Sequence, residues 1–241
     1  MTPLLYDELV PWYFLIDPPG DHADEATWYG DTLERATSLR PETLLELGSG
    51  AGNNALYLRS RFRCTLSDVS PKMLELSRAQ NPECEHIEAD MRTLRLGRTF
   101  DAVFIHDAIS YMTTRADLRA ALATAFAHTK PGGVAVIAPD QMSDTFEEHT
   151  ALHEGHDATR ALRCLEWDWD PDPHDERFRV EYAFLLRDGR ELRAVHDGHD
   201  EGLFSRETWL GLLTEVGFRP QLAPRPLDDG GLEHLLLALR P

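Results

Sequence analysis

The stretch that decides the fold of this chain is LLELGSGAGN, residues 44–53. Its first part, Leu44 to Leu47, is short and apolar, which is typical of a buried parallel strand. Gly48, Gly50 and Gly52 then occupy alternate positions, where a Cβ would block the backbone angles or close contacts of a tight turn. Such a turn brings a ligand against bare backbone at a helix N-terminus, so the stretch predicts a Rossmann-like α/β fold that binds a nucleoside.

Two further features favour a mononucleoside over a dinucleotide. The dinucleotide fingerprint requires a glycine at the position of Asn53, where it permits close packing of helix and strand. Asp68 ends the second expected strand, residues 64–68, and follows Gly48 by twenty positions. A carboxylate there accepts hydrogen bonds from both ribose hydroxyls. The alternative interpretation is a structural turn followed by an ordinary aspartate before the helix that Ser70 and Pro71 begin.

Five segments occur in an informative order. They are ELGSGAG (46–52), Asp68, EADMR (88–92), FDAVFIHD (100–107) and KPGGV (130–134). In this order they resemble the motifs of the class I S-adenosylmethionine-dependent methyltransferases. The resemblance implies that S-adenosylmethionine is the methyl donor, with Asp90 facing the exocyclic amine of adenine and Met91 packing on its ring. The donor-binding residues expected from these segments and their flanks are Glu46, Gly48, Gly50, Gly52, Asn53, Asp68, Val69, Met73, Asp90, Met91, Arg92, His106 and Asp107.

The rest of the chain alternates strands and helices, which implies a parallel sheet with right-handed crossovers. The resemblance makes this a seven-stranded methyltransferase sheet, with residues 41–140 binding the donor and residues 201–241 adding the last helix and strands. Residues 1–40 are rich in aromatic side chains and are expected to form a helical cap, with helices over 7–14 and 23–39. Expected strands are 43–47, 64–68, 86–89, 100–105, 134–139 and 233–239, the last after a Gly230-Gly231 turn; expected helices are 53–59, 71–80, 115–128 and one from Ser205 to Gly217.

Between these parts, residues 141–200 have a different pattern. Segments 163–170, 177–187 and 191–197 read as antiparallel strands, two of them joined by Asp188-Gly189. The insertion follows the carboxyl end of the fifth strand, where ligands sit in open α/β sheets. We therefore expect an antiparallel β lid that closes the acceptor site.

Composition limits the class of partner. The 241 residues are 42% hydrophobic, which is enough for a core, and carry a net charge of −18. This charge repels nucleic acid and is compatible with a neutral or cationic small molecule. Cys64, Cys84 and Cys164 lack metal-ligand spacing and predict reduced thiols. With no signal peptide or membrane-length apolar run in the sequence, we expect a cytoplasmic monomer or homodimer without a membrane partner.

A finer resemblance is to the bacterial amino-sugar N,N-dimethyltransferases. It rests on Tyr6-Asp7 followed by Tyr13, on residues 89–98, and on residues 202–207 after the lid. Such enzymes place a tyrosine from the N-terminal segment and a histidine after the fourth strand beside the amine. Tyr13 matches the tyrosine, whereas the aligned position of the histidine is Tyr111, and His106 lies five residues earlier.

Methyl transfer is an in-line displacement that needs an aligned, unprotonated nucleophile about 3 Å from the methyl carbon. Because the donor is activated by its own positive charge, the protein mainly supplies position and a proton acceptor. We expect Tyr13, His106 and Tyr111 to be the catalytic residues, with His106 acting either as a base or as a hydrogen-bonding group. Asp107 either contacts the donor or caps its loop.

Three lid features have competing interpretations. His149, His153 and His156, with Glu154 and Asp157, lie close enough in the sequence to suggest a metal site. On a helix, His149 and His153 would share a face. A solvated turn is the simpler interpretation, so we expect no metal. Trp167 and Trp169 share one face of a strand and either line the acceptor pocket or pack the sheet; His196 and His199 have the same two options. The aspartates from Asp168 to Asp175 indicate a hairpin tip.

The sequence therefore predicts an enzyme, an S-adenosylmethionine-dependent methyltransferase whose acceptor is a small molecule, with an amine nitrogen favoured. A small-molecule O-methyltransferase is the main alternative. A non-catalytic nucleoside-binding module and an NAD-dependent oxidoreductase are less favoured. Asn53 and the Gly132-Gly133 turn speak against the oxidoreductase.

Overall fold

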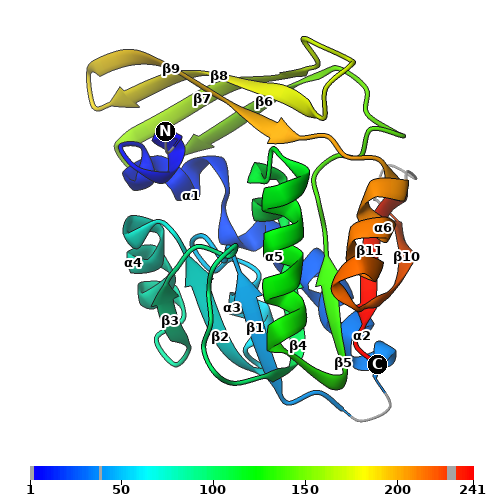
Figure 1. Ribbon diagram of the computed structural model, residues 1–241. Helices are drawn as coiled ribbons and strands as arrows, with labels where there is room; N and C mark the ends of the chain where they lie inside the picture. Colours follow the sequence, from blue (N-terminus) through cyan, green and yellow to red (C-terminus); the bar gives the residue numbers. More distant parts are fainter. Residues whose placement is uncertain (1–2, 38–39, 227–231) are drawn as a thin grey trace.

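The computed structural model describes residues 3–37, 40–226 and 232–241. A seven-stranded sheet with helices on both faces lies below a separate four-stranded sheet, and the N-terminal segment lies between the two (Figure 1). The expected Gly230-Gly231 turn falls outside the described residues.

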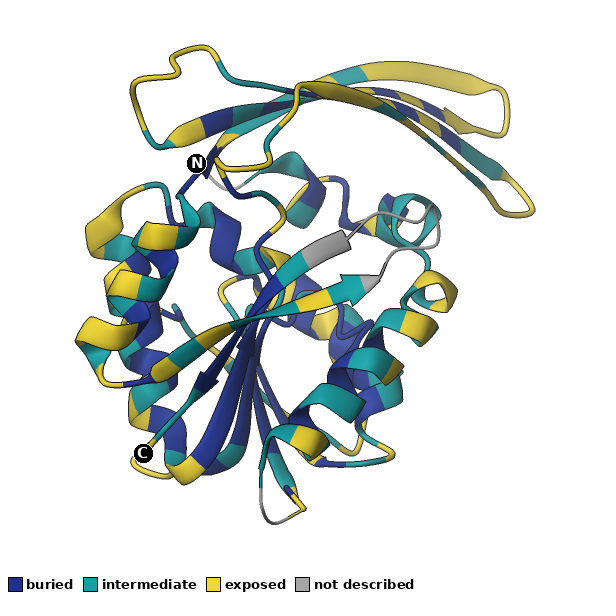
Figure 2. Cartoon of the chain, turned by 90° about the vertical axis from the view of Figure 1, so that its right-hand side faces the viewer, coloured by how far each residue is buried: buried dark blue, intermediate teal, exposed yellow. Residues whose placement is uncertain are grey.

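The large sheet has the order β10-β11-β5-β4-β1-β2-β3, and all its strands run parallel except β11. Its central strands are almost wholly buried, as expected of parallel strands covered on both faces (Figure 2). This order brings the glycine-rich turn after β1 and the loop after β4 side by side at the carboxyl edge of the sheet. The strands are β1 (Thr43–Leu47), β2 (Arg63–Asp68), β3 (Glu85–Glu88), β4 (Phe100–Ile105), β5 (Thr129–Ile137), β10 (Arg219–Pro226) and β11 (Leu232–Leu239).

Helices cover both faces of this sheet with two separate apolar cores. α2 (Ala23–Ala36) and α3 (Ala55–Leu58) pack on one face, and α5 (Arg115–His128) and α6 (Arg206–Val216) pack on the other. The predicted ends of α6 are confirmed: the Ser205 side chain accepts from the backbone N–H of Thr208, and Gly217 has φ of 114°.

The shortest predicted helices depart most from expectation. The helix predicted over 53–59 is reduced to α3, and the helix predicted over 7–14 is wrong. That region consists of the short turns η1 (Leu4–Tyr6) and η2 (Val10–Trp12), then the single turn α1 (Tyr13–Ile16). Pro11 explains the break, because proline removes a backbone donor and disfavours helical angles at the preceding residue. α4 (Pro71–Gln80) matches its prediction, and Ser70 caps it.

The four-stranded sheet is the lid, and it has one strand more than predicted. Its strands are β6 (His149–His156), β7 (Arg160–Trp169), β8 (Arg177–Asp188) and β9 (Glu191–Gly202), paired antiparallel in chain order. The interpretation of the histidine-rich segment as a helix or solvated turn is therefore wrong: it is an edge strand.

Gly155 explains how the lid meets the N-terminal segment, because a Cβ there would lie 1.8 Å from the carbonyl oxygen of Leu15. No side chain fits between the two backbones.

Two general expectations can be compared with the described residues. Cys64, Cys84 and Cys164 are all free thiols. No helix in the described ranges is both long and apolar enough to span a membrane.

Candidate active site

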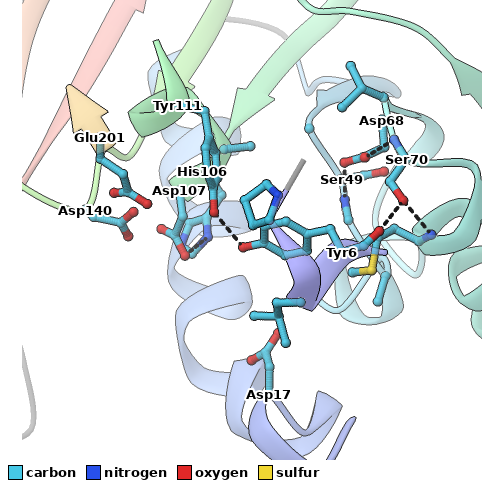
Figure 3. Close-up of a pocket in the computed structure, with 18 of the residues that line it drawn as sticks. Tyr6, Asp17, Ser49, Asp68, Ser70, His106, Asp107, Tyr111, Asp140 and Glu201 are labelled. Atoms are coloured by element: carbon cyan, nitrogen blue, oxygen red, sulfur yellow. Dashed lines mark hydrogen bonds and ion pairs between the residues drawn. The ribbon is translucent and has the colours of Figure 1, made fainter. Parts of the chain in front are cut away.

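A cavity of about 820 Å³ lies between the carboxyl edge of the large sheet, the N-terminal segment and the inner face of the lid. Of the expected donor-binding and catalytic residues, all but Gly52 line it. Figure 3 shows Asp68 and Ser49 on one side of this space, Asp107, Asp140 and Glu201 on the other, and Tyr6 between them.

The glycine-rich turn forms the floor of the first side, and each glycine has a different role. Gly48 has φ of 74°, and a Cβ there would lie 2.3 Å from the Cβ of Ala108. Gly50 has φ of 52°, and a Cβ there would meet only ordinary contacts, the nearest with Met73 at 3.6 Å, so its backbone is not crowded and a ligand can approach it. Gly52 does not line the cavity, which corrects its predicted donor contact. A Cβ at Gly52 would collide with Ser77, so this glycine serves close packing of the turn against α4.

Asp68 is fixed at the end of β2 by two backbone donors. Its Oδ2 accepts from the N–H of Gly50 and its Oδ1 from the N–H of Ser70, both at 2.8 Å. Burial raises the pKa of Asp68, and these two hydrogen bonds oppose that rise. Each carboxylate oxygen keeps a further lone pair, so the group can accept from a ribose diol at the cavity wall. Val69, the next residue, is exposed at the same wall.

Residues 88–92 form the part of the cavity wall where the adenine is expected. The charged side chains there pair with one another. The guanidinium of Arg92 bonds the Asp90 carboxylate at 2.6 Å and Asp117 at 2.9 Å. This pairing lowers the pKa of Asp90. Met91 is buried beside the pair and presents an apolar surface to the cavity. The single guanidinium of this wall is therefore neutralised by two carboxylates.

Unpartnered polar atoms on the donor side test whether S-adenosylmethionine fits. Glu46 Oε2, Ser49 Oγ and Asn54 Oδ1 are buried and form no hydrogen bond within the described chain, and all three residues line the cavity. Burial raises the pKa of Glu46 to about 8. A buried polar atom without a partner is costly, so these atoms fit a ligand with charged ends such as the methionine portion of the donor. The residues present thus suit this molecule.

The N-terminal segment is attached to the glycine-rich turn through Asp17, a residue that the sequence analysis did not single out. Asp17 Oδ2 accepts from Tyr13 Oη at 2.6 Å and from Asn53 Nδ2 at 2.8 Å. His22 bonds the other oxygen at 2.6 Å. Although burial opposes it, the Asp17 and Glu25 carboxylates raise the pKa of His22 to about 10. The only sequence signal at Asp17 is the helix-breaking Pro18-Pro19 that follows it.

The loop after β4 contributes His106 and the short helix η4 (Asp107–Tyr111). His106 Nε2 lies 2.9 Å from Tyr29 Oη, and its Nδ1 lies 2.9 Å from Asp107 Oδ2. Tyr111 Oη donates to Tyr6 Oη at 3.0 Å. Both ring nitrogens of His106 therefore have partners within the protein, and the histidine holds the carboxylate of Asp107.

Phenols from two parts of the chain meet between the two sides of the cavity. Burial, with Asp17 as the next cause, raises the pKa of Tyr13 well above its usual range. Burial does the same for Tyr111, with Tyr6 as the next cause. These groups stay protonated at neutral pH, so they orient ligands by hydrogen bonds rather than remove protons.

Three carboxyls gather where β4, β5 and β9 end, and we call Asp107, Asp140 and Glu201 the strand-end carboxylates (Figure 3). Asp107 exposes 52% of its side chain and lines the cavity. Burial raises the pKa of Asp140 well above its usual range, and the neighbouring Asp107 carboxylate is the next cause of this rise. The pKa of Asp107 is lowered, because His106 outweighs the effect of burial. The group therefore shares protons and attracts cations.

The lid adds polar residues that sequence reasoning assigned elsewhere. Glu166 and Asp168 of β7 face the cavity, with Tyr182 of β8 donating to Glu166 at 3.2 Å. Trp167 lies on the opposite, exposed face and stacks with Trp169, so neither tryptophan lines the cavity.

The histidines of the lid divide between its two faces. His149 and His153 line the cavity, where His149 lies 3.5 Å from Asp168 and His153 bonds Glu166. His199 bonds Glu201 at 2.9 Å and stacks on Tyr111, whereas His196 pairs with Glu181 on the outer face. Among the residues that the structure describes, no three His, Cys, Asp or Glu side chains are arranged to hold a metal ion.

Comparison with known proteins shows what the chain is similar to. Residues 44–133 match the methyltransferase domain family. Over 207 residues the chain is 28% identical to the dTDP-3-amino-3,4,6-trideoxy-alpha-D-glucopyranose N,N-dimethyltransferase of Streptomyces venezuelae, covering 83% of this chain and 84% of that protein. It is 25% identical over 213 residues to a trans-aconitate 2-methyltransferase of Escherichia fergusonii, covering 86% and 78%.

A solved structure agrees in fold over most of the chain. The S-adenosylmethionine complex of an amino pentose methyltransferase from Micromonospora echinaspora superposes with a TM-score of 0.79 at 26% identity, covering 91% of each chain. Together with the family match, this similarity confirms the predicted enzyme class, fold and methyl donor.

We predict that Asp68→Ala weakens binding of S-adenosylmethionine and of its demethylated product by about 2 kcal/mol or more, roughly 30-fold in Kd. The loss follows from removing two charge-assisted hydrogen bonds. Calorimetry measures it, with Asp31→Ala on the exposed surface of α2 as the control that keeps its affinity. Unchanged donor binding in Asp68→Ala, or tight NAD binding by the wild type, would contradict this assignment.

We also predict a pH-dependent stability difference from Glu46. Its folded pKa of about 8 lies above the ordinary 4.5, so between these values the folded state binds more protons. The free energy of unfolding contributed by Glu46 therefore falls as pH rises through this window, by at most about 1.4 kcal/mol per pH unit. Glu46→Gln removes this slope. Urea unfolding of both proteins without donor from pH 5 to 8 should show the variant gaining relative stability; parallel curves would refute the prediction.

Proposed function

We propose that this chain, a class I S-adenosylmethionine-dependent methyltransferase, transfers methyl groups directly to an amine nitrogen of a small molecule, without a metal. The observation that carries the proposal is the shape of the cavity. One side fits the donor, and the lid covers the other side, which is lined by phenols and carboxylates. Such a space suits a small acceptor.

The charge of the acceptor side supports an amine. The strand-end carboxylates attract a protonated amine to the cavity and stabilise it there. The amine must then lose a proton, because only its free lone pair attacks. Although burial opposes it, His106 lowers the pKa of Asp107, so this carboxylate stays ionised; it can accept a hydrogen bond from the ammonium group while the proton passes to solvent.

The phenols supply orientation. Tyr13 donates its own proton to Asp17, so its oxygen lone pairs remain to accept from an amine N–H. Tyr111 donates to Tyr6 and restricts the position of the second phenol. Bound S-adenosylmethionine supplies a methyl group already activated by the charge on sulfur, so alignment of the nitrogen is the main contribution of these side chains.

The same electrostatics disfavour the other class of acceptor among the relatives. An organic acid, such as the aconitate in the name of the Escherichia fergusonii enzyme, would meet several carboxylates in this cavity. Like charges at short distance repel strongly in an enclosed site. An amine acceptor, like those named for the Streptomyces venezuelae relative, therefore agrees better with the lining.

We predict that Tyr13→Phe and His106→Ala each lower the rate of methyl transfer about 10- to 1000-fold while donor affinity stays nearly unchanged. The reason is loss of alignment for the amine and loss of the group that positions Asp107. Transfer of labelled methyl to a panel of small amines measures the rate. Tyr57→Phe is the matched control, because Tyr57 donates to Pro19 outside the cavity and its loss leaves the rate unchanged.

Full activity in the double variant Tyr13→Phe/His106→Ala would show that these groups do not position the acceptor. A strict requirement for magnesium, or methylation of hydroxyl acceptors only, would replace the proposal with an O-methyltransferase.

A further inference from the structure

We infer that the acceptor is a small amine with at least two ammonium groups and no phosphate, such as a free diamino sugar. This inference rests on the proposed N-methylation and specifies its substrate class. It departs from the nucleotide-linked amino sugars named for the Streptomyces venezuelae relative.

The first observation is a second acidic region, separate from the strand-end carboxylates. Glu166 and Asp168 stand two residues apart on β7, so both point from the same face of the lid into the cavity. We call them the lid carboxylates. The cavity thus presents carboxylates from the sheet below and from the lid above, which matches a ligand with cationic groups at two positions.

The second observation is a buried acceptor atom without a hydrogen-bond partner within this region. Asp168 is 5% exposed and lines the cavity, and its Oδ1 accepts no hydrogen bond from any described residue. Burial, and then the neighbouring Glu166, raises the pKa of Asp168 to about 6, so it is mainly ionised at neutral pH. A buried carboxylate oxygen without a donor is costly, and a ligand ammonium supplies the missing donor.

The histidines near the lid carboxylates do not make this region basic. His153 bonds Glu166, which raises the pKa of the histidine. His149 lies 3.5 Å from Asp168 Oδ2, the oxygen on the other side of the same carboxylate. Each histidine has its own carboxylate partner, so the two rings add no unpaired basic group to this part of the lid.

The third observation is that the described residues of the acceptor side include no arginine or lysine to hold a phosphate. Arg92 is the only arginine or lysine among the described lining residues, and it lies on the donor side, bound to Asp90 and Asp117. Arg163 and Arg179 of the lid are paired with Glu154 and Glu181 on its outer face. A diphosphate is recognised by arginine, lysine or helix N-termini, and here it would face carboxylates.

The test compares three acceptors: glucosamine, a diaminoglucose and UDP-glucosamine. Their binding is measured by calorimetry with the demethylated donor product present, and their kcat/KM by transfer of labelled methyl. We expect the diaminoglucose to bind at least 10-fold more tightly than glucosamine, and UDP-glucosamine at least 10-fold more weakly. In Asp168→Asn the advantage of the diaminoglucose over glucosamine should fall at least 5-fold.

Two controls show that any loss is local. Glu154→Gln removes a carboxylate from the outer face of the neighbouring strand β6 and should keep the wild-type preference. Affinity for the demethylated donor product reports whether Asp168→Asn is folded. If Asp168→Asn fails to fold, Glu166→Gln takes its place with the same expected loss of preference.

The outcomes separate the inference from the function on which it rests. Equal or tighter binding of UDP-glucosamine, or no preference for the diaminoglucose, with methyl transfer to nitrogen still observed, would overturn the inference alone. Methyl transfer to hydroxyl groups and to none of these amines would overturn the proposed function, and the inference with it.

Discussion

The carboxylate of Asp17 joins the N-terminal segment to the glycine-rich turn, and the cover over the acceptor side of the cavity depends on this junction. One of its oxygens accepts from Asn53 of the turn and from Tyr13 of the segment. The lid in turn rests on that segment, through the close backbone contact of Gly155 with Leu15 and through Leu4, whose N–H donates to Asp197 of β9. Without these contacts the donor side would remain, but the lid would not be held over the acceptor.

The cavity concentrates negative charge, and this has a cost that ligands offset. Ionised groups in an enclosed space lose hydration, and close carboxylates repel one another. Two of these groups are kept protonated: burial raises the pKa of both Asp140 and Glu46, and the neighbouring Asp107 adds to the rise at Asp140. A cationic donor on one side and a cationic acceptor on the other would favour the ionised forms, so the charge of the site is matched to its ligands rather than to the empty protein.

Sequence patterns predicted the large sheet well because its elements are fixed locally. The ends of α4 and α5 follow from the caps Ser70 and Thr114, which are visible in the sequence. The donor-facing residues followed from a turn and a strand end, with Gly52 as the exception, since its constraint is packing against a helix that lies further along the chain.

The acceptor side could not be predicted because long-range packing decides it. Because successive side chains of a strand point to opposite faces, the sequence shows that Trp167 and Trp169 share one face and that Glu166 and Asp168 share the other. It does not show which face meets the cavity, and that choice is made by the contact of the lid with the N-terminal segment. Asp17 was missed because its partner Asn53 is distant in sequence.

The most direct measurement is a crystal structure with the demethylated donor product and a diaminoglucose. The account predicts the nucleoside against Asp68 and Gly50 and the sugar enclosed beneath the lid, with one nitrogen beside Tyr13 and the other at Asp168; a sugar outside the lid, or a nucleoside elsewhere, would contradict it.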